Sequence, residues 1–144
     1  MSYNTWCPTC TNRFSNEAKC KYILEQLTGE IFIKTRTTLG TYKDNNTYLE
    51  LDMYNEKLKL ALEYNGEQHY RQIEYFYHDE ESFIELQKRD ELKIRLCEER
   101  GIKLIIVKYD IRTDEEKINY ITQQLLEKNV QIKNKNISMK GYYI

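Results

Sequence analysis

The segment KLIIVKY, residues 103–109, constrains the fold more strongly than any other part of this sequence. It is a short and almost continuous apolar run, and it follows residues 82–100, a long segment that Gly101 is expected to end as a helix. An apolar run of this kind predicts a buried strand, which we expect near the centre of a sheet. The rest of the chain must supply neighbouring strands and covering helices.

Residues 48–54 alternate between apolar and polar side chains and predict a second strand. A turn over 55–58 and a returning strand over 59–64 complete a hairpin that places Asp52 opposite Ala61. The other expected elements are a helix over 16–27 capped by Ser15, a strand over 31–36, a loop or hairpin over 37–47, and a helix over 113–128 opened by a capping box. This order predicts a mixed α/β fold whose sheet lies between helices.

Composition limits the class of protein. A length of 144 residues favours one domain, and a mean hydropathy of −0.78 with no long apolar run predicts neither a membrane span nor a membrane partner. The opening MSYNTWCPTC lacks a signal-peptide pattern, so we expect an intracellular protein. A net charge of −1 argues against a surface that binds nucleic acid everywhere, although 22 lysines and arginines leave room for a local basic face.

Two of the four cysteines form a Cys7-Pro-Thr-Cys10 pair, which is frequent in zinc sites. Zinc needs four ligands, and no second Cys or His pair lies nearby in the sequence. Three interpretations stay open: a turn without metal, half of a Zn²⁺ site completed by a second copy, or the remnant of a zinc module. Cys20 and Cys97 are expected on apolar helix faces as small hydrophobic residues.

Asp52 and Glu63 are expected on the same face of adjacent strands. Two converging carboxylates can hold a divalent cation such as Mg²⁺, which takes one or two protein carboxylates and completes its shell with water and phosphate. A solvated strand face shared with Lys57 and Lys59 is an equally good interpretation of these two acids alone.

Three further polar residues stand out. Asp90 interrupts an apolar stripe of the long helix, made of Phe83, Leu86, Ile94 and Cys97, and needs either a salt bridge or a role in a site. Glu17 in the first turn of the opening helix is explained by the helix dipole alone. His69 follows the Asn65-Gly66 turn and could transfer a proton near neutral pH, although a loop histidine is commonly just exposed.

The order of these residues resembles the PD-(D/E)XK nuclease superfamily, and within it the branch of very-short-patch-repair endonucleases and EDxHD homing endonucleases. The resemblance covers residues 15–109 and is carried by LELDMYNEKLKLALEYNGEQHY and QKRDELKIRLCEERGIKLIIVKY. It implies a restriction-endonuclease-like mixed sheet flanked by helices. The domains would be a CxxC segment over 1–14, a nuclease domain over 15–128 and a basic tail over 129–144. Such proteins occur in phages and large DNA viruses, which would place this one in the host cytoplasm.

The resemblance also implies an activity, that of a metal-dependent DNA endonuclease leaving a 5′-phosphate. Asp52 and Glu63 would hold Mg²⁺ or Mn²⁺, and His69, positioned by Gln68, would act as general base or acid. Glu17 and Asp90 would orient His69 or metal-bound waters. The alternative is a module that retains the fold and binds DNA without cutting it, and RNA is a third, weaker substrate class.

The sequence departs from the family at Asn65, which stands where the wider ExK motif has lysine. An active enzyme would therefore need Gln68 or His69 to take over that role, and we favour His69 because it titrates near neutral pH. Candidate nucleic-acid contacts are Asn65, Tyr70, Arg71 and Lys93, although Lys93 is also explained as a surface lysine. A homodimer is one arrangement that would allow both DNA strands to be cut.

Overall fold

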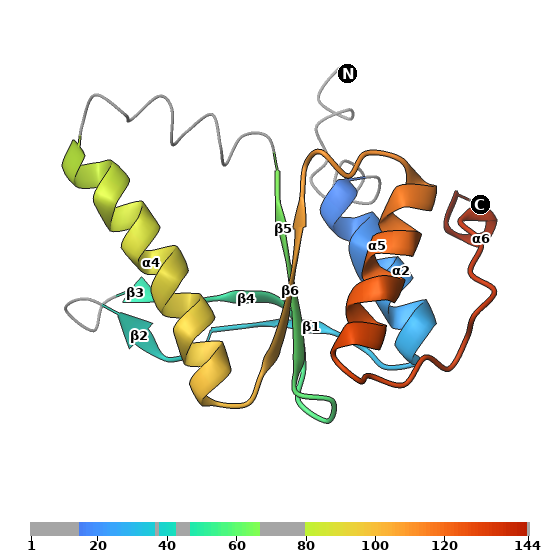
Figure 1. Ribbon diagram of the computed structural model, residues 1–144, viewed down its shortest axis with the longest axis horizontal. Helices are drawn as coiled ribbons and strands as arrows, with labels where there is room; N and C mark the ends of the chain where they lie inside the picture. The colour runs from blue at the N-terminus through green and yellow to red at the C-terminus, as the bar shows by residue number, and fades with distance from the viewer. Residues whose placement is uncertain (1–14, 37, 43–46, 67–79, 144) are drawn as a thin grey trace, which may run out of the picture. The chain divides into compact units, whose positions relative to one another are not determined.

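The computed structural model describes residues 15–36, 38–42, 47–66 and 80–143, and the side chains of 42, 47 and 80–86 are not described (Figure 1). These residues divide into two compact units. A helical unit contains the described residues up to Ile31 and from Asp110 onward, and a sheet unit contains those between Phe32 and Tyr109. The division crosses the single domain predicted over 15–128, since the first and last long helices share the helical unit.

The sheet unit is built on a four-stranded mixed sheet in the order β1-β4-β5-β6. The strands are β1 (Ile33–Thr35), β4 (Leu51–Asn55), β5 (Leu60–Asn65) and β6 (Lys103–Lys108). Strand β4 is antiparallel to β1 and β5, whereas β6 is parallel to β5. Strands β2 (Thr41–Tyr42) and β3 (Thr47–Tyr48) form a separate antiparallel pair. A mixed α/β chain with a mixed sheet, the coarse part of the fold prediction, is thereby confirmed.

The expected central position of β6 is wrong for the part of the chain that the structure describes. Here β6 pairs with β5 and ends the strand order. Ile105 and Val107 are nevertheless buried, and Leu104 and Ile106 are partly buried. The apolar run therefore reflects a strand with little exposure on either face, which does not require a neighbouring strand on both sides.

The hairpin that joins β4 to β5 differs in register from the prediction. Tyr54, not Asp52, lies opposite Ala61, because the turn occupies 56–59 instead of 55–58. Asn55 Oδ1 accepts a hydrogen bond from the backbone N–H of Leu58 at 2.7 Å, and Lys59 takes a φ of 51°. The register moves by two residues, an even number, so Asp52 stays on the face of Glu63 and comes closer to it.

A β-bulge interrupts β4 at the level of this acid pair. Ile33 of β1 pairs with Tyr54, and Thr35 pairs with Leu51, so one residue of β1 faces two residues of β4, Asp52 and Met53. A bulge bends its strand and redirects the side chains within it. The strict alternation expected over 48–54 is therefore broken next to Asp52.

Helix α4 (Glu80–Glu99) packs on the sheet and closes the core of this unit. Its Cys97 joins a buried cluster, and Leu92 and Leu96 pack against that cluster. The buried members are Leu39, Leu49, Leu51, Tyr54, Ala61, Cys97 and Ile102. Ile94 was expected on the same stripe, but it is 45% exposed, because the buried stripe is centred on Leu96 and Cys97.

The helical unit contains α2 (Asn16–Thr28), α5 (Asp114–Glu127) and α6 (Lys140–Tyr143), and α2 packs against α5. Both predicted caps are confirmed. Ser15 Oγ accepts a hydrogen bond from the backbone of Ala18, and Thr113 and Glu116 form a reciprocal capping box. Helix α6 is also attached here, since the ring of Tyr142 lies against that of Tyr22 in a tilted arrangement, with ring centroids 5.1 Å apart.

Cys20 and Cys97 are free thiols that lie buried on α2 and α4, as predicted from their apolar neighbours. Burial raises the pKa of Cys20 to about 12 and that of Cys97 to about 11, so neither is an accessible thiolate at neutral pH. Among the described residues, no helix is both long and apolar enough to cross a membrane.

Replacing Lys59 by glycine should stabilise the hairpin that carries the acid pair. A side chain at φ 51° costs about 1–2 kcal/mol, and glycine removes this strain at an entropic cost of about 0.5–1 kcal/mol. We expect the free energy of unfolding in urea to rise by about 0.5–1 kcal/mol for Lys59→Gly. Lys57→Gly in the same turn, where φ is not positive, should have the opposite sign; a gain from both variants would contradict strain at Lys59.

Candidate functional site

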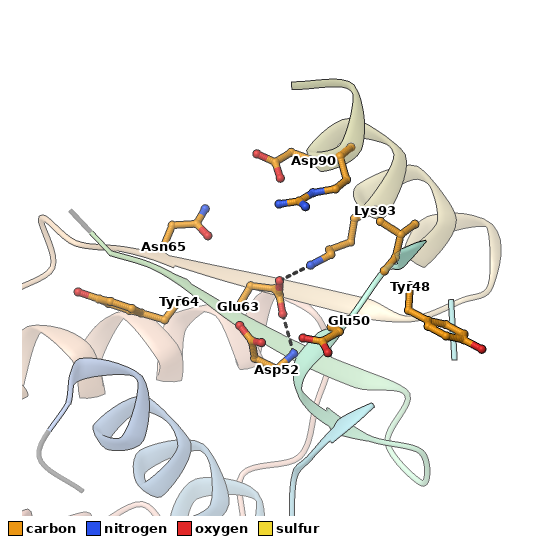
Figure 2. Close-up of a pocket in the computed structure, with 10 residues that line it drawn as sticks. Tyr48, Glu50, Asp52, Glu63, Tyr64, Asn65, Asp90 and Lys93 are labelled. Carbon is orange, nitrogen blue, oxygen red and sulfur yellow. Dashed lines mark hydrogen bonds and ion pairs between the residues drawn. The ribbon is translucent and has the colours of Figure 1, made fainter. Parts of the chain in front are cut away.

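A polar pocket of about 290 Å³ lies between the strands β4 and β5 and helix α4 (Figure 2). Acids enter it from the strands, and α4 contributes both an acid and two cationic side chains. Its lining residues are Tyr48, Leu49, Glu50, Asp52, Glu63, Tyr64, Asn65, Arg89, Asp90 and Lys93. The structure therefore brings four residues of the predicted site, Asp52, Glu63, Asn65 and Asp90, to one pocket, together with Lys93.

Glu63 is the central residue of this pocket, and both of its carboxylate oxygens are engaged. Lys93 Nζ donates to Oε1 at 2.7 Å, and the backbone N–H of Asp52 donates to Oε2 at 2.8 Å (Figure 2). The second bond satisfies a backbone donor within the bulge of β4, where the strand ladder is disturbed. Glu63 therefore fixes both the local backbone at Asp52 and the position of α4 at Lys93.

Burial dominates the electrostatics of this carboxylate. The Glu63 side chain is 12% exposed, and desolvation raises its pKa above the usual value, with the Asp52 charge acting in the same direction. The Lys93 ammonium and the bond from Asp52 lower the pKa and offset part of this rise. Glu63 is thus a carboxylate whose ionised form depends on nearby positive charge.

Asp52 and Glu63 together fit a small divalent cation with few protein ligands. They extend from adjacent strands into one polar pocket, and Asp52 is partly exposed. Within the described ranges no group of three or more His, Cys, Asp or Glu side chains could hold a metal ion. Two protein carboxylates are a donor set that Mg²⁺ or Mn²⁺ can accept, because these ions complete their shells with water and substrate oxygens.

Asp90 lies on α4, one turn before Lys93, and lines the pocket that contains the acid pair. It also lines an adjoining, more apolar pocket of about 310 Å³ between α4 and β6, together with Asn65 and Lys108. Asp90 is partly buried. It therefore occupies the margin between the two pockets instead of the centre of an apolar stripe.

Glu50 is a further acid of the pocket, but it is already paired. Arg36 Nε donates to Glu50 Oε2, and this hydrogen bond lowers the pKa of Glu50. The pair is largely exposed, so it contributes little to stability. Glu50 consequently differs from Glu63, whose pKa is shifted in the opposite direction.

Other predicted site residues are not placed in this pocket. Glu17 is exposed in the first turn of α2 and belongs to the helical unit. Gln68, His69, Tyr70 and Arg71, and the Cys7 and Cys10 pair, lie outside the described residues. Their predicted roles stay predictions.

The contact between Lys93 and Glu63 was not predicted from the sequence. A surface lysine was one explanation for Lys93, yet its side chain is only 20% exposed and contacts Glu63, thirty residues away in sequence. Its spacing gave a usable signal. Lys93 precedes Leu96 by three positions and Cys97 by four, and therefore lies on the buried stripe, where a cation needs an acidic partner.

Comparison with known proteins finds viral relatives. The sequence is 46% identical to uncharacterized protein 307L of Invertebrate iridescent virus 6 over 81 residues, which are 56% of this chain and 40% of that protein. It is 38% identical to uncharacterized protein 033L of Invertebrate iridescent virus 3 over 67% of this chain and 50% of that protein. It is 37% identical to uncharacterized protein 094L of Frog virus 3 over 67% of this chain and 63% of that protein.

The chain thus spans about half the length of the curated relatives it matches. No family model matches the sequence. No solved structure matches it either.

The raised pKa of Glu63 predicts a specific dependence of stability on pH. A carboxyl whose pKa is raised by folding contributes most stability below its unfolded pKa, near 4.5, and loses that contribution as pH rises through the folded pKa. The free energy of unfolding of the native protein minus that of Glu63→Gln should therefore fall as pH rises from 4.5 toward neutrality. Urea denaturation in EDTA at several pH values measures this difference.

Glu50→Gln provides the matched control for this titration. The pKa of Glu50 is lowered, so its contribution is present above 4.5 and is lost as pH falls through the lower folded pKa. The corresponding difference should rise with pH, weakly because the pair is exposed. If the difference in unfolding free energy between the native protein and Glu63→Gln stays flat or rises with pH, the stabilisation of ionised Glu63 by Lys93 outweighs the cost of burying its charge.

Proposed function

We propose that this protein is a divalent-metal-dependent endonuclease that hydrolyses phosphodiester bonds in DNA. The observation that carries the proposal is the combination of Asp52 and Glu63 on adjacent strands with Lys93 and Arg89 above them, in one polar pocket. Phosphodiester hydrolysis needs both signs of charge, since carboxylates hold a cation and cationic side chains attract the phosphate. The family resemblance of the sequence supports the same reaction and a 5′-phosphate product.

The acidic half of the pocket supports a metal-binding role. Asp52 is the primary candidate ligand, because its backbone is held by Glu63 while its side chain is partly exposed in the pocket. Glu63 is the second ligand, and it also fixes the bulged backbone beneath Asp52. A bound Mg²⁺ or Mn²⁺ would stabilise negative charge on the phosphate and favour ionisation of a water.

The cationic half of the pocket supports binding of an anionic substrate. Arg89 and Lys93 occupy adjacent turns of α4 and line the pocket of the acids. Lys108, at the end of β6, lines the adjoining pocket and is exposed. These three side chains lie among the five acids of the two pockets, Glu50, Asp52, Glu63, Asp90 and Glu91, and they would provide local cationic contacts for phosphate oxygens.

The remaining roles rest on the sequence. His69 would take the proton from the attacking water or give one to the leaving oxygen, and Gln68 would position it. Asp90, at the pocket margin, would orient this histidine or a water. Asn65, which lines the pocket at the end of β5, can donate or accept a hydrogen bond but cannot supply a charge.

A second function, DNA binding without cleavage, is favoured by two observations. Both oxygens of Glu63 already have partners, and Asn65 stands where related enzymes carry a lysine. A protein that had lost catalysis could retain this closed arrangement as a structural link between α4 and the sheet. Binding of DNA in Mn²⁺ without any cleavage would support this function.

Asp52→Asn should abolish metal-dependent cleavage. The amide keeps the size of the side chain but removes the charge that a divalent cation needs, so nicking of supercoiled DNA in Mg²⁺ or Mn²⁺ should fall on the order of 100-fold or more. Agarose-gel assays with supercoiled, linear and branched DNA, each with an EDTA control, measure the effect. Circular dichroism should be unchanged, since the Asp52 backbone contact to Glu63 is retained.

Glu98→Gln is the matched control, because Glu98 is an exposed acid on α4 that lies outside both pockets. Its nicking rate should stay close to that of the native protein. Cleavage that persists in Asp52→Asn, or that is independent of added metal, would contradict the proposed site. Binding of DNA by the native protein without cleavage would favour the second function instead.

A further inference from the structure

Lys93 supplies the positive charge that a divalent cation would otherwise bring to Glu63. Its ammonium lies 2.7 Å from Oε1 of a carboxylate whose side chain is 12% exposed, and the Lys93 side chain itself is 20% exposed. A carboxylate with so little access to water is costly to ionise without a nearby cation. Figure 2 shows Lys93 reaching from α4 to Glu63 across the pocket.

A metal ion and the ammonium compete for the same atom. Lys93 already donates to Glu63 Oε1, and a metal ion bound to the same oxygen would place two positive charges within a few ångströms, where they repel each other strongly in a poorly solvated pocket. Oε2 accepts the backbone N–H of Asp52 at 2.8 Å, so only part of its lone-pair capacity remains for a metal. A cation that used Glu63 as a ligand would therefore lie close to the Lys93 ammonium, and displacement of Lys93 would relieve the repulsion between the two charges.

We propose that Lys93 is a built-in counter-cation of the acid pair, which a divalent metal must displace in order to bind. This inference rests on the cation site in the proposed function and adds a regulatory device to it. Lys93 lowers the affinity for free metal, and its displacement releases an ammonium into a pocket that Arg89 also lines. The released ammonium can then bind an anionic oxygen, so metal and phosphate are expected to bind cooperatively.

The identity of the side chain suits this exchange. Lysine carries a compact charge on a flexible stem and can change partners by rotation, whereas a bidentate arginine would hold the carboxylate in a fixed geometry. Lys93 also lines both neighbouring pockets, so it can move between them without a change in the helix. The other paired acid of the pocket, Glu50, has an arginine as its partner, Arg36, and not a lysine.

Direct titration of Mn²⁺ in the absence of nucleic acid tests the proposal. Lys93→Met removes the competing charge, and it should bind Mn²⁺ about 10- to 100-fold more tightly than the native protein in isothermal calorimetry. Saturating Mn²⁺ should also raise its melting temperature more than that of the native protein. Lys88→Met, an exposed lysine of the same helix outside both pockets, should behave as the native protein.

Lys93→Gln repeats the test with a neutral side chain that can still donate a hydrogen bond to Glu63, in case Lys93→Met does not fold. Unchanged or weaker Mn²⁺ binding by the folded Lys93 variants would overturn the proposal, as would equal tightening by Lys88→Met. The outcome is separable from that of the nuclease proposal. If the Lys93 variants bind Mn²⁺ more tightly but the native protein does not cleave DNA, the counter-cation proposal is supported and the nuclease proposal is contradicted. If the native protein cleaves DNA but the Lys93 variants bind Mn²⁺ with unchanged affinity, the nuclease proposal is supported and the counter-cation proposal is contradicted.

Discussion

The parallel pairing of β5 with β6 is the constraint on which the rest of the sheet unit depends. The two strands pair over their full lengths, from Leu60 with Lys103 to Asn65 with Lys108. Parallel neighbours cannot be joined by a tight turn, so the chain must leave one end of β5 and return to the other end of the sheet. Helix α4 lies in that connection and packs on the sheet. The contact between α4 and the acid pair is therefore a consequence of strand direction.

The carboxylate of Glu63 connects strand β5, the bulged strand β4 and helix α4. It satisfies the backbone N–H of Asp52, compensates the disturbed ladder at a β-bulge, and anchors Lys93 of α4. Its burial makes each of these contacts more important, because an unsatisfied carboxylate in this position would be costly. A residue that looks like a simple metal ligand in sequence is thus also a structural junction, and substitutions of Glu63 test two properties at once.

Local signals in the sequence predicted local structure well. Ser15 and the Thr113–Glu116 box specify helix starts through contacts only a few residues apart. The strand predicted over 48–54 was found only in part, since β3 ends at Tyr48 and β4 begins at Leu51. The hairpin register was missed by two residues, since nothing in the residue types reveals that Lys59 takes a positive φ. The partner of Lys93 was missed because it lies thirty positions away and depends on the crossover. The prediction still placed Asp52 and Glu63 on the same face of the sheet, because an error of two residues in the hairpin register does not change the face on which a side chain lies.

The order of the two units along the chain has a consequence for synthesis. The sheet unit is one uninterrupted segment, whereas the helical unit is assembled from described residues on both sides of it. During vectorial translation α2 leaves the ribosome before the sheet unit, but the helix it packs against, α5, is made only after the whole sheet unit. The apolar face of α2, with Ile23 and Leu24, therefore waits for that partner while the sheet folds. Among the described helices, α2 is thus made before the sheet unit but can complete its packing only after that unit has been synthesised.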